Sequence, residues 1–300
     1  MMLRYERLHR FPAVFKSMTG LHVAQLDALL HDVLPRFQAA EFARLNRPDR
    51  QRAVGGGHPF ALEPHNQILL TVIWLRLYPI HEVLAYLFGV SDTAVSHAIA
   101  RVLPLLEASG QDTMRMPDPG RKRRRTLDAL LAATPDLVVV IDTFEQPVQR
   151  HQDRSVADTY YSGKKKRHTL KSQVIINGRT RQVICTAQAR GPVHDFALYQ
   201  QSRVEPHESL EVLADSGYQG LSKLHAKSKT PQKKPRKSEL TEAQKQANRE
   251  LASRRVAVEH VIRSLKIFRI LAERYRNRRK RLLLRFNLIA GLYNYDLRLG

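Results

Sequence analysis

Apolar residues recur every three or four positions through residues 23–47, and few of them are β-branched. This spacing predicts one or two amphipathic helices. A loop follows that holds three consecutive glycines, Gly55 to Gly57. Residues 65–79 are apolar on nearly every side and predict a buried helix that Pro79 closes. No apolar run approaches the roughly 20 residues of a membrane span, so we expect a soluble protein.

Residues 80–106 have the pattern of a helix-turn-helix. Gly89 supplies the tight turn, and Ser91 is a candidate N-cap for the second helix. Thr93, Ser96 and His97 then face outward in the half of that helix that reads base edges in the major groove. An ordinary pair of core helices has a similar pattern, and this alternative stays open.

Strand patterns begin after a basic, periodicity-free stretch at residues 115–135. Residues 137–142 (LVVVID) predict a strand buried on both faces. The runs 168–176 and 179–187 predict a hairpin joined at Asn177 and Gly178. A helix near 196–202 and a strand at 210–215 complete the expected α/β core.

The remaining chain predicts a lysine-rich insertion at 221–240, a long helix over 241–270 and an apolar helix over 282–297. We therefore expect an N-terminal helical region (1–57), a helix-turn-helix domain (58–114), a basic linker (115–135) and a mixed-sheet domain (136–300).

The charge of the chain favours a polyanionic partner. Its 50 Lys and Arg against 28 Asp and Glu give a formal charge of +22. Such an excess attracts nucleic acid, although a basic RNA-binding structural protein would show it too. The single cysteine, Cys185, is expected in the core, and with no apolar signal segment at the N-terminus it favours a reducing cytosol.

Three carboxylates stand where chain geometry can bring them together: Asp142 and Asp215 at the ends of predicted strands, and Glu259 in the long helix. Such a cluster repels itself unless a cation neutralises it, and its hard oxygens select Mg²⁺ or Mn²⁺. Two such ions suit phosphodiester cleavage. Each acid also has a structural interpretation, as a strand-end turn former, an Asx-turn before Gly217, or a partner of nearby arginines.

The surroundings of Glu259 favour a function on DNA. Arg255, Glu259, Arg263 and Lys266 share one helix face at 3.6 residues per turn. A single acid in a row of cations suits a helix that contacts phosphates while its carboxylate reaches a metal.

Five segments together resemble the DDE transposases of bacterial insertion sequences, in the branch of insertion-sequence family five. They are IDTFEQPV, YYSGKKKRHTLKSQV, GPVHDFALY, LADSGYQG and RRVAVEHVIRSLK. The similarity covers about residues 62–295. The D-x-G-Y pattern at Asp215 and the R-x3-E-x6-K pattern at Arg255 are its diagnostic parts. The wider superfamily often has Tyr three residues before that Arg, where this chain has Ala252, which puts only a tyrosine contact to DNA in doubt.

The resemblance implies a ribonuclease-H-like catalytic domain in which Asp142, Asp215 and Glu259 bind two Mg²⁺ ions, with Mn²⁺ as a substitute. It implies binding of terminal inverted repeats, cleavage of 3′ ends, and joining to target DNA by a dimer or larger assembly in the bacterial cytoplasm, on the nucleoid. Asp195 competes for the second carboxylate position but is expected to cap a helix at Phe196. A non-catalytic helix-turn-helix regulator is the alternative. The residues expected to contact DNA are Thr93, Ser96, His97, Lys164, Lys165, Lys166, Arg167, His168, Tyr218, Arg255, Arg263 and Lys266.

Overall fold

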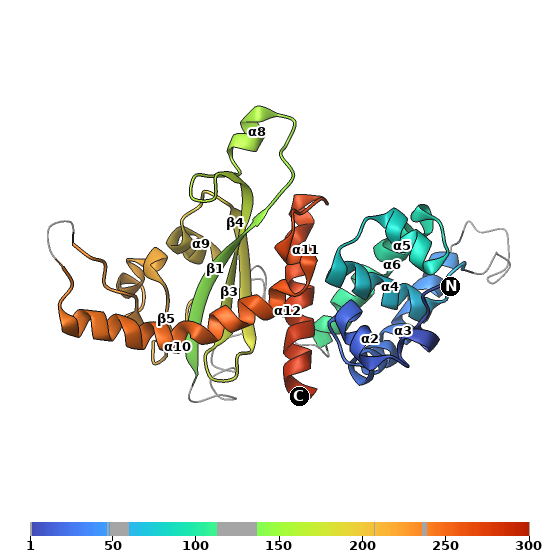
Figure 1. The fold of residues 1–300 in the computed structure, drawn as a ribbon, viewed down its shortest axis with the longest axis horizontal. Helices are drawn as coiled ribbons and strands as arrows, with labels where there is room; N and C mark the ends of the chain where they lie inside the picture. The colour runs from blue at the N-terminus through green and yellow to red at the C-terminus, as the bar shows by residue number, and fades with distance from the viewer. Residues whose placement is uncertain are drawn as a thin grey trace. The chain divides into compact units, whose positions relative to one another are not determined.

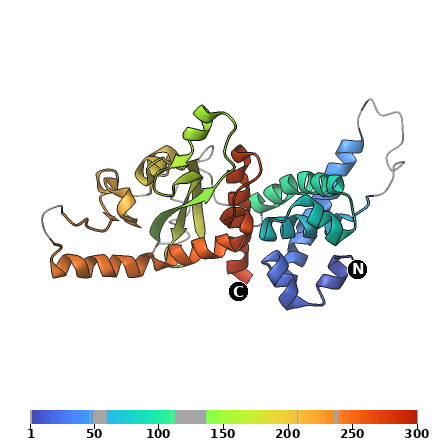
Figure 2. The same cartoon turned by 45° about the horizontal axis from the view of Figure 1, so that its top comes forward.

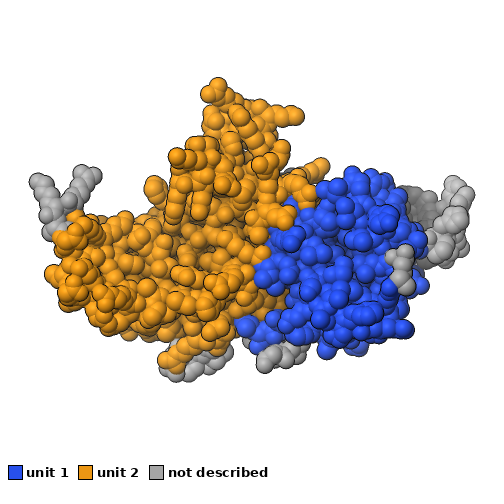
Figure 3. All heavy atoms as spheres, viewed as in Figure 1, with its two compact units in different colours: residues 1–115, 267–270, 295–300 blue, residues 116–266, 271–294 orange. Residues whose placement is uncertain are grey.

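The computed structural model describes residues 2–46, 48, 60–112, 137–206, 208–235 and 239–299. The chain divides into two compact units, coloured separately in Figure 3. The first comprises Met1–Arg115, Ile267–Ile270 and Tyr295–Gly300, and the second comprises Met116–Lys266 and Leu271–Asn294. The expected basic linker at 115–135 and the three-glycine loop lie outside the described residues.

The first unit is helical (Figure 1). Its interior is built around α4, whose residues from Asn66 to Leu75 are all buried because the segment is apolar on nearly every side. The predicted pattern over 23–47 forms one helix, α3, with Pro35 inside it. The helices are α1 (Tyr5–Leu8), α2 (Pro12–Thr19), α3 (Val23–Leu45), α4 (Pro64–Leu77), α5 (His81–Phe88) and α6 (Asp92–Asp112).

Helices α5 and α6 form the predicted helix-turn-helix. Gly89 ends α5 in the left-handed conformation at φ 62°, which a residue without a Cβ adopts at little cost. The Ser91 hydroxyl then accepts a hydrogen bond from the Ala94 amide at 3.1 Å, so it caps α6 as expected. Thr93, Ser96 and His97 are exposed.

The second unit contains a mixed sheet ordered β2-β3-β1-β5-β6, with β4 paired to β3. Strand β1 pairs antiparallel with β3 and parallel with β5. The expected α/β class is confirmed, and the mixed sheet is consistent with a ribonuclease-H-like domain. The strands are β1 (Val138–Pro147), β2 (Tyr161–Ser162), β3 (Arg167–Asn177), β4 (Val183–Arg190), β5 (Glu211–Leu213) and β6 (Ser228–Lys229).

Two strand predictions need correction. The turn between β3 and β4 is longer than Asn177-Gly178, because the Asn177 amide bonds the Gln182 carbonyl at 2.9 Å and Arg181 takes the positive φ, 61°. Strand β4 therefore begins at Val183. Strand β1 also continues past Asp142 to Pro147, because β3 is long enough to pair with it throughout. The lysine-rich insertion is not all loop, since it contains β6.

Helices cover both faces of this sheet. The turn after β5 and α9 pack on the face that carries Val139, Ile141 and Ile175. Helix α10 contacts β1 and β3, and its N-terminal part extends beyond the sheet in Figures 1 and 2. The Phe144 and Phe286 rings, 5.5 Å apart, join α12 to β1. The helices are α8 (Arg154–Asp158), α9 (Asp195–Ser202), η1 (Ser216–Tyr218), η2 (Leu221–Lys223), α10 (Glu242–Lys266), α11 (Arg269–Ala272), η3 (Arg279–Arg281) and α12 (Leu282–Leu299).

Across the described residues, no single helix has the length and apolar composition of a membrane span. Only α5 and α6 taken together reach both measures, and they do so with a bend of 98° between them.

Candidate active site

The parallel β1–β5 ladder ends two residues before each of the two predicted aspartates. Val140 pairs with Leu213 as the last pair of this ladder. Asp142 follows within β1, and Asp215 follows in the turn after β5, where its side chain accepts a hydrogen bond from the Gly217 amide. Strand β5 stops at Leu213 while β1 continues to Pro147. From Thr143 to Gln146, β1 therefore pairs with no described strand on its β5 side, which leaves an opening at this edge.

The third predicted acid, Glu259, lies on α10, which packs against β1 and β3. Val258, Val261 and Leu265 are buried, which turns Glu259 toward the rim of the opening, where it is exposed. One turn earlier, Arg255 Nη2 lies 3.5 Å from Asp142 Oδ2, and both side chains are largely buried. The predicted row on α10 is thus divided: Arg255 pairs with Asp142, while Arg263 is exposed.

A pocket of about 390 Å³ opens at this edge. It brings Asp142, Glu259 and Asp195 together with lysines, including Lys164 and Lys165. Asp215 is not among the residues that line it. The other lining residues are Thr143, Phe144, Glu145, Lys171, Ile262 and Lys266.

The charges in this pocket perturb one another. Burial raises the pKa of Asp142 to about 6, and the nearby Asp215 and Glu259 carboxylates add to the rise. Hydrogen bonding from the Thr143 amide and the Arg255 charge oppose it. Burial likewise lowers the pKa of Lys266, and the charge of Lys165 lowers it further. The Lys266 ammonium lies 4.8 Å from the centre of the Phe144 ring. In this pocket, therefore, neither the Asp142 carboxyl nor the Lys266 ammonium has its charge fully balanced by its neighbours.

Asp195 belongs to the pocket but has a partner of its own. Its Oδ1 lies 2.6 Å from Lys171 Nζ, and the two side chains are 15% and 10% exposed. Helix α9 begins at Asp195, with His194 at the N-cap, so Asp195 does not cap a helix at Phe196 as expected. Its carboxylate lies against the turn after Asp215, where a Cβ on Gly217 would stand 2.4 Å from Oδ2.

The acids suit a hard divalent cation in chemistry, since their oxygens are the ligands that Mg²⁺ and Mn²⁺ prefer. Burial raises the pKa of Asp142 most, and the neighbouring Asp215 and Glu259 carboxylates raise it further, so a bound cation would stabilise its charged form. The ligand atoms of these acids are, however, farther apart than in a closed metal site. Among the described residues only Glu6, Glu63 and His65, in the first unit, place three ligand atoms within 4.8 Å of one another.

Some of the cationic residues expected to contact DNA line the pocket, and others lie outside it. Lys164, Lys165 and Lys266 line the pocket. Lys166 and Arg167 are exposed. His168 packs against Tyr161, with ring centres 5.7 Å apart.

Tyr218 differs from the expectation of a DNA contact. Its side chain has no exposed surface. Its ring packs on Tyr199, and its hydroxyl lies 3.3 Å from Gln173 Oε1. The aromatic residue of the D-x-G-Y pattern therefore anchors the turn that carries Asp215 and does not face solvent.

Sequence reasoning missed Lys171 and Glu145. They are cross-strand neighbours on β3 and β1, and both line the pocket. A lysine within a strand that is otherwise largely buried was the available signal, because a buried lysine requires an acidic partner.

Comparison with known proteins decides the family. A family model described as a DDE superfamily endonuclease matches residues 141–294, the part of the chain that carries Asp142, Asp215 and Glu259. The chain belongs to the DDE superfamily endonucleases. A second model, the helix-turn-helix of DDE superfamily endonucleases, matches residues 60–112, which confirms the helix-turn-helix interpretation over the pair of ordinary core helices.

A relative agrees with this DDE endonuclease assignment. It is named a probable transposase for insertion sequence element IS702, from Microchaete diplosiphon, and is 40% identical over 234 residues. The match covers 78% of this chain and 81% of the relative. No solved structure matches. The resemblance to insertion-sequence transposases seen in the sequence is thereby confirmed, and the family implies use of a divalent metal.

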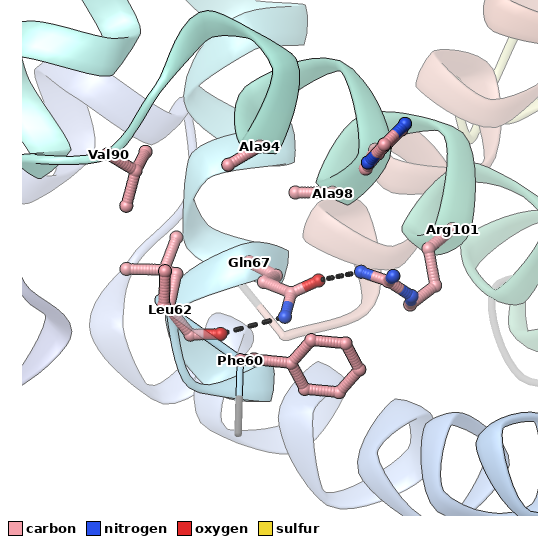
Figure 4. Close-up of a pocket in the computed structure, with 9 residues that line it drawn as sticks. Phe60, Leu62, Gln67, Val90, Ala94, Ala98 and Arg101 are labelled. Atoms are coloured by element: carbon pink, nitrogen blue, oxygen red, sulfur yellow. Dashed lines mark hydrogen bonds between the residues drawn. The ribbon is translucent and has the colours of Figure 1, made fainter. Parts of the chain in front are cut away.

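Contacts on the opposite side of α6 hold its exposed residues in place. Figure 4 shows Arg101 of α6 directed toward Gln67 and Phe60. The guanidinium donates to Gln67 Oε1 at 2.8 Å, lies 3.1 Å from Glu41 Oε1, and stacks 4.4 Å from the Phe60 ring centre. Gln67 in turn donates to the Leu62 carbonyl at 2.7 Å. This network fixes the rotation of α6 and hence the direction of its solvent face.

Proposed function

We propose that this protein is a transposase that cleaves DNA at the ends of its element and joins the freed 3′ ends to target DNA. One observation carries the proposal: Asp215 lies near enough to raise the pKa of the buried Asp142, and Glu259 of α10 lines the same lysine-bearing pocket as Asp142. Membership of the DDE endonuclease family supports it.

We assign Asp142, Asp215 and Glu259 as the ligands of two Mg²⁺ ions, with Mn²⁺ as a substitute. When bound, such ions activate an attacking oxygen and stabilise the leaving oxygen. Asp215 is preferred to Asp195 as a ligand because Lys171 already neutralises Asp195 at 2.6 Å.

The chain's own cations bind and orient the DNA. Lys164, Lys165 and Lys266 border the pocket and attract the scissile phosphate. Arg255, whose Nε is buried without a partner among the described residues, restrains the Asp142 carboxylate. Lys166, Arg167, His168 and Arg263 contact the flanking backbone.

The first unit selects the DNA sequence. Thr93, Ser96 and His97 are exposed near the start of α6, where recognition helices read base edges. Because two terminal inverted repeats must be held together, a dimer or larger assembly forms on DNA. We infer that it acts in the cytoplasm, on the nucleoid.

A cleavage assay on a labelled duplex from the element's end tests this function. Wild-type protein should cut with Mg²⁺ or Mn²⁺ and not with EDTA. Glu259→Gln should abolish cutting and leave binding equal or tighter, because the amide is a poor metal ligand and removes a charge that repels phosphate. Undiminished cutting by this variant would exclude a catalytic role for Glu259.

Two cysteine substitutions test which of the two aspartates, Asp215 or Asp195, binds the metal. Sulfur is a softer ligand than carboxylate and suits Mg²⁺ poorly. We expect Asp215→Cys to be inactive with Mg²⁺ and partly active with Mn²⁺. Asp195→Cys should show no such dependence on the metal. The reverse pattern would assign Asp195 as the ligand.

A further inference from the structure

The Tyr160 ring contacts two arginine side chains. The guanidinium carbons of Arg190 and Arg279 lie 5.3 and 4.5 Å from the ring centre. Neither arginine forms an ion pair with a residue that the structure describes, and Nη1 of Arg279 is buried without a hydrogen-bond partner there. A guanidinium held by a ring keeps its N–H donors for a ligand. The pair is therefore organised in advance for an anion.

Two of these three side chains extend from segments that are hydrogen-bonded to Thr169 of β3. The Thr169 amide donates to the Tyr160 carbonyl at 2.8 Å. The Thr169 carbonyl accepts from the Gly191 amide at 2.9 Å, which fixes the end of β4 that carries Arg190. These backbone hydrogen bonds fix the positions from which the Tyr160 and Arg190 side chains extend toward each other.

Arg279 is fixed by the chain that precedes α12. Tyr275 donates its amide to the Pro147 carbonyl at 2.8 Å and accepts from the Gln149 amide at 3.3 Å, so this segment extends the end of β1. The segment is strongly basic. Its exposed arginines include Arg274, Arg278 and Arg281.

A short chain of bonds connects this cluster to the pocket. The Thr169 hydroxyl donates to Glu145 Oε2 at 2.7 Å, and Glu145 lines the pocket. The Arg190–Tyr160–Arg279 cluster thus lies one residue beyond the pocket wall. A nucleic-acid strand that enters the pocket has to continue past a neighbouring surface, and this one is cationic.

We propose that Arg190, Tyr160 and Arg279 form a binding site for backbone phosphates of the DNA strand that occupies the pocket. The inference rests on the proposed function for the identity of that strand. The two guanidinium groups bind phosphates through their free N–H edges, and the Tyr160 ring orients them. The site positions DNA and takes no part in bond cleavage.

The test measures binding of full-length protein to a labelled random-sequence duplex, and to one of its strands alone, across a series of salt concentrations with EDTA. Arg190→Gln and Arg279→Gln should each weaken binding about fivefold at 0.1 M salt. Each should also lower the slope of log affinity against log salt by about 0.9 on duplex or 0.7 on the single strand. Arg181→Gln, an exposed control in the turn at the other end of β4, should change neither value appreciably.

Variants of Tyr160 test whether the ring contributes to DNA binding beyond the charges of the two arginines. Tyr160→Phe should bind like wild type, since the ring is kept. Tyr160→Leu should weaken binding at least as much as Arg279→Gln, because it releases both guanidinium groups. The double variant should lose less than the sum of the two single losses, because both substitutions remove the contact of Arg279 with the ring. Equal losses for Arg181→Gln, or additive losses in the double variant, would overturn the proposal.

Melting temperatures guard against misfolding. If the arginine variants melt earlier but bind DNA like wild type, the stack is only structural and the proposal fails. Binding with EDTA does not depend on cleavage, so wild-type protein that binds through this site but never cuts with Mg²⁺ or Mn²⁺ would refute the proposed function and leave the binding site standing.

Discussion

The buried carboxyl of Asp142 makes the stability of the fold depend on pH. Its pKa rises from 3.8 to about 6 on folding, so the folded protein binds this proton more tightly than the unfolded chain does. Stability from this group is fully present below pH 3.8 and is lost as the pH rises through about 6. At neutral pH the Asp142 carboxyl is therefore charged although its buried surroundings favour the neutral form.

We expect Asp142→Asn to remove this pH dependence. Without divalent metal, the free energy of unfolding of wild type relative to the variant should fall by about 2 to 3 kcal/mol between pH 3.5 and pH 8. Urea unfolding at several pH values measures it. Added Mg²⁺ should raise the melting temperature of wild type at pH 8 and not that of the variant. A flat difference with pH would contradict the burial of this carboxyl.

The ion pair between Lys171 and Asp195 should be essential to the fold around the pocket. Lys171→Met leaves a largely buried carboxylate unpaired, which should cost about 3 kcal/mol in urea unfolding. Lys171→Met with Asp195→Leu should recover most of that loss. Arg154→Ala is the control, because it breaks an exposed pair 3.9 Å long with Asp158 and should change stability by less than about 0.5 kcal/mol. A loss as large in the control would contradict the argument.

At the scale of elements, local sequence determines most of the helices. The buried α4, the Gly89 turn and the Ser91 cap follow from apolar spacing and capping chemistry, and the structure agrees with them. Strand lengths follow less well. Strand β1 reaches Pro147 because β3 supplies a partner, and β6 forms in a lysine-rich stretch because it pairs with β5.

The pocket could be predicted only in part for the same reason. Asp142 and Glu259 stand out in the sequence by pattern, but the place of Lys171 depends on pairing across strands far apart in the chain. Tyr218 looked like a DNA contact because its motif is diagnostic, whereas its burial is a tertiary property.

The turn of the helix-turn-helix gives a prediction at this scale. Gly89→Ala forces a Cβ into a left-handed position at φ 62°, where it would also stand 2.4 Å from the Met2 side chain. We expect a loss of about 1 to 2 kcal/mol in thermal or urea unfolding. Gly163→Ala is the matched control, since its Cβ would meet nothing within 4 Å. Equal effects of the two substitutions would contradict the turn geometry.

At the scale of the whole molecule, the charge of +22 bears on the affinity for DNA and not on the selectivity among DNA sequences. Phosphate contacts supply affinity that falls steeply with salt and carries no sequence information, while base contacts supply selectivity. We propose that α6 in the first unit supplies the base contacts and that the lysines around the pocket in the second unit supply phosphate contacts.

Substitutions in full-length protein should separate the two roles. Thr93→Ala, Ser96→Ala and His97→Ala together should abolish enrichment of a sequence motif from a random duplex library, because these side chains are exposed on the reading half of α6. The slope of log affinity against log salt should remain nearly unchanged, since none of them carries a permanent positive charge. Lys164→Ala with Lys165→Ala should enrich the same motif as wild type and lower the slope by about 1.8, two phosphate contacts at 0.9 each. If the α6 variant still enriches the wild-type motif while the lysine variant loses it, sequence recognition resides in the second unit, and α6 only anchors the protein to DNA.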